Sequence, residues 1–178
     1  MADDVTPGYL VVDLSPEGVC VGGLMVTDEN GLPLDFRFTD PITPTRLQRV
    51  LYGGALERYL RADVVAGTLL SSIEVLPTVL FVDDEALLDP PKAECPVGMV
   101  QTTRLPPLGP AGTVKGEHGH ALVQPADDVA PVRVTAVDDA TVAAVTPSLV
   151  AVGARMDAVE PLDRVRRALG LISSGEMS

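Results

Sequence analysis

Three apolar runs separated by turn-forming residues occupy the first 38 positions and constrain the fold more than any other feature. They span residues 9–14, 19–27 and 34–38. Asn30-Gly31, between the second and third runs, is the strongest short-range signal for a hairpin. The third run alternates apolar and polar side chains, as a half-buried strand does. The pattern predicts a three-stranded β-meander.

The hydrophobic period changes to that of a helix after residue 42. Thr45 and Gln48 have the spacing of a capping box, so we expect a short helix that ends near Leu51 and is broken at Gly53-Gly54. A second helix is predicted over residues 55–72. Residues 78–82 form a continuous apolar run, which is typical of a fully buried strand.

Breaker residues dominate the next part of the chain, because twelve Pro and Gly residues lie within positions 90–125. We expect one strand at 97–103 and otherwise a long loop, which is either functional or disordered. Further elements are a strand at 132–137, a short helix or strand at 140–145, a last buried strand at 149–152 and a helix at 161–172.

Together these elements predict one α/β domain over residues 1–178, with α+β as the alternative. It consists of a β-β-β-α-β unit at 8–85, a Pro/Gly-rich loop region at 90–127, and strands with a C-terminal helix at 128–173. The sheet is expected to be mixed, opening with the meander and followed by the pair of helices and the buried strand.

Charge and termini restrict the partners and the compartment. The 178 residues include 25 Asp and Glu against 13 Lys and Arg, a net charge of −12. Such a charge repels polyanions, so nucleic acid is not an expected partner. The start of the chain lacks the basic and apolar segments of a secretory signal, which predicts a cytoplasmic protein. Arg outnumbers Lys 11 to 2, which suggests a bacterial source rich in G and C.

Acidic residues stand where they could bind metal ions: Asp13 ends the first predicted strand, Glu57 lies on the helix at 55–72, and Asp83-Asp84 follow the buried strand. This order resembles the beginning of the ribonuclease H-like fold, over about residues 8–85. The resemblance implies Mg²⁺ or Mn²⁺ ions that activate water for phosphodiester hydrolysis. The alternative is structural: Asp13 ends a strand and Asp83-Asp84 open a turn or cap a short helix.

A basic segment lies within this acidic chain. Five of the 13 basic residues fall within 25 positions: Arg37, Arg46, Arg49, Arg58 and Arg61. Arginine binds phosphate or carboxylate through two parallel donors, so the segment is predicted to hold an anionic ligand or a partner protein. The alternative is a solvated helix face, or ion pairs with the protein's own acids.

The only two histidines, His118 and His120, are separated by one residue. On a strand both side chains would face the same way and could bind one metal ion. With Gly112 and Gln124 they resemble the first cupin motif, with Gln in the place of Glu. An exposed loop is the alternative for this segment.

No P-loop, dinucleotide-binding or nucleophile-elbow motif is present. We therefore expect a non-enzymatic domain without a cofactor, which binds a protein partner, or a second copy of itself, in a bacterial assembly. A metal-dependent phosphodiesterase or nuclease that uses the four acidic residues is the alternative function.

Overall fold

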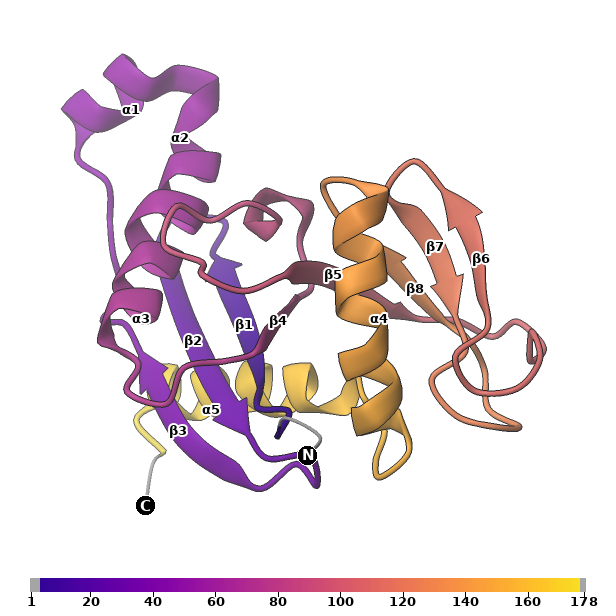
Figure 1. Cartoon of the computed structure of the whole chain (residues 1–178). Coiled ribbons are helices and arrows are strands. Elements are labelled where there is room, and N and C mark those ends of the chain that lie inside the picture. Colours follow the sequence, from indigo (N-terminus) through magenta and orange to yellow (C-terminus); the bar gives the residue numbers. More distant parts are fainter. Residues whose placement is uncertain (1–3, 177–178) are drawn as a thin grey trace.

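The computed structural model describes residues 4–176, which form an eight-stranded mixed sheet (Figure 1). The strand order is β3-β2-β1-β4-β5-β8-β7-β6. Strands β1, β4 and β5 are parallel, and the other neighbouring pairs are antiparallel. The strand bounds are β1 (Pro7–Leu14), β2 (Cys20–Thr27), β3 (Pro33–Phe38), β4 (Val79–Val82), β5 (Val97–Thr102), β6 (Val114–Glu117), β7 (His120–Val123) and β8 (Val132–Thr135). The predicted α/β fold and its opening β-meander are confirmed.

Helices cover both faces of the sheet because its central strands are apolar on both faces. On one face, Leu10 and Val12 of β1 pack with Leu60, Val65 and Leu69. The helical segments of this layer are α1 (Arg46–Tyr52), η1 (Gly53–Ala55), α2 (Leu56–Arg58), η2 (Tyr59–Ala66), which is π-helical, and α3 (Gly67–Ser72). A single turn, η3 (Glu85–Leu87), follows β4.

The other face is covered by α4 (Asp139–Gly153) and α5 (Glu160–Ser174). Tyr9 and Val11 of β1 belong to this second core, together with Val165 and Leu169 of α5. The helix approaches β2 closely at Gly23, where an added Cβ would lie 3.0 Å from Val165 Cγ1. The small residue therefore allows α5 to lie against β2 and β1, the strand that carries Asp13.

The first predicted helix has the expected start. The hydroxyl of Thr45 accepts a hydrogen bond from the Gln48 N–H, and the Gln48 side chain accepts one from the Thr45 N–H. This is the capping box that the sequence predicts. No residue of α1 is buried, and the helix extends beyond the end of the sheet (Figure 1).

Two elements differ from the sequence prediction. The strand expected at 149–152 is the end of helix α4, whose buried side chains follow a helical spacing: Val142, Val145, Leu149 and Val152. The region 90–127 is not a single loop with one strand, because it also contains the β6–β7 hairpin. No helix within residues 4–176 is both long and apolar enough to cross a membrane.

Candidate active site

Asp13 and Asp83 lie near each other where two parallel strands end. Asp13 is the penultimate residue of β1, and Asp83 directly follows β4, which pairs with β1 in parallel. Packing around the Asp13 carboxyl group removes part of its hydration and raises its pKa above the ordinary value, and the negative charge of Asp83 raises it further. Arg166 and Arg61 oppose this shift. Within residues 4–176 the Asp13 side chain has no hydrogen-bond or ion-pair partner.

Asp83, in contrast, is bound by an arginine of helix α5, which covers one face of the sheet. Arg166 of α5 donates from Nε and Nη2 to the same oxygen, Asp83 Oδ2, over 3.1 and 2.6 Å. The Asp83 side chain is 20% exposed and that of Arg166 is 43% exposed. The ion pair therefore lies at the protein surface with its arginine toward solvent.

A second arginine joins the remaining two acidic residues. Arg61 of η2 donates to Glu57 Oε1 over 3.1 Å, and its Nη1 lies 3.4 Å from Asp84 Oδ2. The other oxygen of Asp84 accepts a hydrogen bond from the Ala86 N–H and caps η3. The structure thus brings all four predicted acids to one region, but Glu57 and Asp84 are paired with Arg61.

The acids suit one divalent ion better than two. Within residues 4–176 no group of three or more His, Cys, Asp or Glu side chains is arranged to hold a metal ion. Mg²⁺ commonly binds proteins through only one or two carboxylates, with water and substrate phosphate as its other ligands. The unpartnered carboxyl of Asp13 and the adjacent Asp83 fit that requirement. The pair of ions implied by the ribonuclease H-like resemblance does not fit.

An open cavity of about 540 Å³ adjoins Asp83. Asp83 and Arg166 border it, together with Gln101 and Thr102 of β5. A second cavity, of about 550 Å³ and lined mainly by apolar residues, shares Thr102 and Asp157 with the first. The sequence does not single out Arg166, because only the packing of α5 against the sheet brings this side chain to Asp83.

The basic segment is divided among several contacts. Arg37 pairs with Asp35 and Glu74, and Arg49 donates to the Glu17 main-chain oxygen. Arg46 and Arg58 are exposed, so a binding role for these two residues stays a prediction. Arg61 is the member of the segment that lies among the predicted acids.

The two histidines do not lie together on one strand. His118 occupies the turn between β6 and β7 with a φ of 58°, and His120 begins β7. Gln124, the fourth position of the cupin-like motif, is fully buried. Its amide holds the main chain of Leu108, Ala126 and Val129 through hydrogen bonds of 2.7–2.8 Å. The residues of the cupin-like motif therefore form a hairpin and hold a neighbouring loop in place, and they do not converge on a metal site.

No protein-family model and no curated protein matches this sequence. Solved structures do match it. Endonuclease V from Streptomyces avermitilis has a TM-score of 0.53 and 16% identity, and the match covers 96% of this chain and 83% of the other. Endonuclease V from Ciona intestinalis, bound to a 24mer DNA with an inosine followed by a ribo-adenosine, has a TM-score of 0.53 and 14% identity, with 97% and 88% covered. The chain has an endonuclease V-like fold.

These similarities correct two expectations. The chain resembles nucleases, which contradicts the prediction of a non-enzymatic domain for protein–protein assembly and favours the nuclease alternative. Two of the similar endonuclease V structures hold DNA, which contradicts the exclusion of nucleic acid. The net charge of −12 does not exclude nucleic acid, because net charge describes the average field, whereas binding depends on local groups and bound cations.

Proposed function

We propose that this chain is a divalent-metal-dependent phosphodiesterase that acts on nucleic acid. The observation that carries the proposal is the proximity of Asp13 and Asp83, at the ends of neighbouring parallel strands, in an endonuclease V-like fold. The sequence offered both positions as metal-binding acids only in its alternative function. The solved relatives support nucleic acid as the substrate class.

Asp13 and Asp83 would hold the ion in this proposal. When bound, a divalent ion would polarise a phosphoryl oxygen and lower the pKa of a coordinated water. Asp13 is suited to this role because its carboxylate has lost part of its hydration and is not neutralised by a direct partner. Arg61 keeps the main chain next to Asp13 fixed, through a hydrogen bond of 2.7 Å to the Val12 oxygen.

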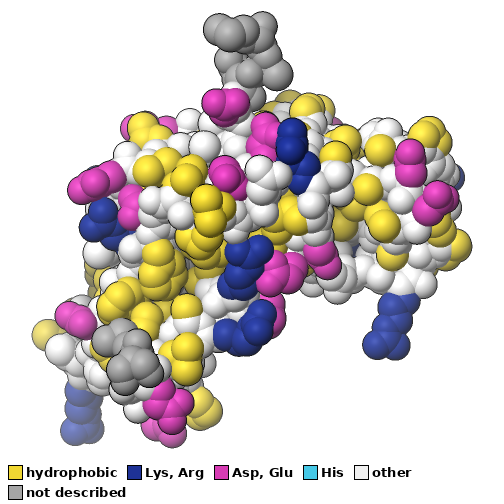
Figure 2. All heavy atoms as spheres, turned by 90° about the horizontal axis from the view of Figure 1, so that it is seen from below, with side chains coloured by type: hydrophobic (Ala, Val, Ile, Leu, Met, Phe, Trp, Pro, Cys, Tyr) yellow, Lys and Arg dark blue, Asp and Glu magenta, His cyan; other side chains and the backbone are white. Residues whose placement is uncertain are grey.

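The negative net charge of the protein does not make every part of its surface repel nucleic acid. On the face seen in Figure 2, acidic and basic side chains are interspersed with apolar ones, and no single sign covers that face. Beside the proposed site, Arg166 borders the open cavity and supplies a positive charge. Arginine side chains are well suited to bind phosphate.

A cleavage assay with a matched pair of variants tests the proposal. Labelled single- and double-stranded DNA and RNA, with and without inosine, are incubated with Mg²⁺, with Mn²⁺ or with a chelator. We expect metal-dependent cleavage by the wild type that is lost in Asp13→Asn and kept in Asp89→Asn, since Asp89 is exposed and takes part in none of the contacts that join the cluster. Cleavage that persists in Asp13→Asn, or no cleavage of any substrate by the wild type, contradicts the proposal.

A further inference from the structure

The contact between Arg166 and Asp83 differs from the other arginine contact in the cluster. Both donors of Arg166 point to one oxygen, Asp83 Oδ2, and no other partner of Arg166 is present within residues 4–176. Arg61 also binds the main-chain oxygen of Val12, and its side chain is only 13% exposed. Arg61 is therefore held in place by several contacts. Arg166 is exposed to solvent and would lose only its contact with Asp83 if it moved away.

We infer that Arg166 is an exchangeable counter-ion that competes with the divalent ion for Asp83 and so sets the metal affinity of the site. This inference rests on the proposed function, because it concerns the same pair of carboxylates. In the metal-free protein, the guanidinium of Arg166 neutralises Asp83 and so reduces the repulsion between the carboxylates of Asp83 and Asp13. Asp13 and Asp83 would hold the ion, so the ion and the Arg166 guanidinium would compete for the negative charge of Asp83, and ion binding would weaken the two hydrogen bonds from Arg166 to Asp83 Oδ2.

The surroundings favour such an exchange. The open cavity next to Asp83 is bordered by three further acidic residues, namely Asp157, Glu160 and Asp163. Glu160 and Asp163 are themselves paired with Arg164 and Arg167, whereas Asp157 has no arginine partner within residues 4–176. A displaced guanidinium thus stays in contact with water and beside the Asp157 carboxylate. Charge-assisted hydrogen bonds from arginine to a carboxylate are among the stronger ones in proteins, so their loss has a measurable effect on ion binding.

Calorimetric titration of the full chain with Mn²⁺ tests the inference without any substrate. Arg166→Gln is compared with Arg167→Gln, which removes the same charge one position away, where the side chain pairs with Asp163 instead. We expect one bound ion, an affinity about tenfold higher in Arg166→Gln, and an affinity within about twofold of the wild type in Arg167→Gln. Asp13→Asn is expected to abolish binding in either background.

A second measurement does not depend on any variant folding correctly. In the wild type, the Arg166 Nε–H resonance is followed by NMR while diamagnetic Mg²⁺ is added. We expect this resonance to shift as the hydrogen bonds to Asp83 break, and the Arg61 resonance to stay in place.

The outcomes separate this inference from the proposed function. Equal Mn²⁺ affinity in Arg166→Gln and the wild type, or an unmoved Arg166 resonance at saturating Mg²⁺, overturns the inference while metal binding and cleavage still support the function. The absence of ion binding in every variant overturns both. An equal gain in Arg166→Gln and Arg167→Gln also overturns the inference, because it would reflect net charge alone.

Discussion

The Nη1 atom of Arg61 lies 2.7 Å from the main-chain oxygen of Val12, the residue before Asp13. The same side chain reaches Glu57 on its own helical layer and Asp84 after β4. One guanidinium therefore links β1, the end of β4 and the helices that cover them. The position of Asp13 relative to Asp83 depends on this link, since it fixes the strand end that carries Asp13.

Replacement of Arg61 by methionine is expected to destabilise the protein by about 2 kcal/mol, because it leaves a partly buried acceptor and two carboxylates without their donor. Denaturant unfolding followed by circular dichroism measures the change. Arg58→Met is the matched control, since Arg58 is exposed, and its effect should stay within about 0.5 kcal/mol. Equal stability of the two variants would show that the Arg61 link carries no net stabilisation.

Asp13→Asn is expected to make the protein more stable at pH 7, although it removes a proposed metal ligand. The folded protein raises the pKa of Asp13 above its ordinary value of 3.8, so the fold favours the protonated form and ionisation destabilises it. This destabilisation is absent below about pH 3.8 and complete above the raised pKa. Functional residues that lower the folding stability in this way are a common origin of trade-offs between stability and activity.

Unfolding of the wild type and Asp13→Asn in metal-free buffer, from pH 7 down to pH 4, measures this dependence. The stability advantage of the variant should shrink as the pH falls, whereas Asp89→Asn should show no such trend. If Asp13→Asn is less stable than the wild type at pH 7, the Asp13 carboxylate is stabilised by its surroundings and the argument fails.

Local signals account for the parts of the fold that the sequence predicted. The three strands and the Thr45 capping box depend on neighbouring residues, which are visible in the sequence. Helix α4 was predicted only in part, as a short helix or strand at 140–145 followed by a strand at 149–152, because Pro147 and the surrounding Ala and Val residues obscure the spacing of its buried side chains. The Asp138 cap, which accepts a hydrogen bond from the Thr141 N–H over 2.7 Å, was the available signal.

The site was predictable only in part for a related reason. Asp13 and Asp83 could be found because acids at the ends of buried strands meet when the strands are parallel neighbours. The arginine on Asp83 could not, since Arg166 lies 83 residues away and reaches it only through the packing of α5. The role of Arg61 was also hidden, because charge alone does not show whether an arginine faces solvent or the protein's own carboxylates.

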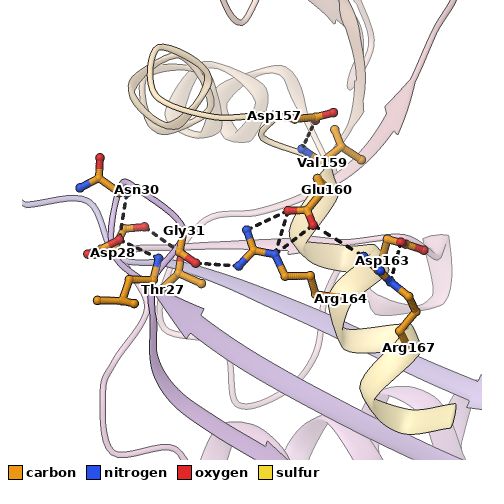
Figure 3. A network of polar contacts seen from close by, with 11 residues as sticks. Thr27, Asp28, Asn30, Gly31, Asp157, Val159, Glu160, Asp163, Arg164 and Arg167 are labelled. Carbon is orange, nitrogen blue, oxygen red and sulfur yellow. Dashed lines mark hydrogen bonds and ion pairs between the residues drawn. The ribbon is translucent and has the colours of Figure 1, made fainter. Parts of the chain in front are cut away.

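Arg164 of α5 is expected to contribute more to stability than its neighbour Arg167. Figure 3 shows Arg164 between Glu160 and the turn before β3, where its Nη1 donates to the Gly31 oxygen over 2.7 Å. Arg167 pairs with Asp163 in an exposed position. We expect a loss of about 2 kcal/mol for Arg164→Met and at most about 0.5 kcal/mol for Arg167→Met. Similar losses in denaturant unfolding would contradict the importance of the contact to the turn.

The β6–β7 hairpin is expected to depend on Gly119. This glycine has a φ of 76°, and an added Cβ would lie 2.6 Å from the main-chain oxygen of Ala136. Alanine at this position meets both an unfavourable backbone conformation and a clash with fixed backbone, so Gly119→Ala should destabilise the protein by about 2 kcal/mol or more. Thermal and denaturant unfolding measure the effect.

Gly170→Ala provides the opposite expectation in the same measurement. Gly170 lies exposed on α5 with open space where a Cβ would be added. Alanine loses less conformational freedom than glycine in a helix, so this variant should gain about 0.5–1 kcal/mol. Opposite signs for the two substitutions would show that the hairpin, which lies in the Pro/Gly-rich region, has a specific backbone geometry. Wild-type stability in Gly119→Ala would instead mean that the hairpin adapts, and that the close approach to Ala136 is not required.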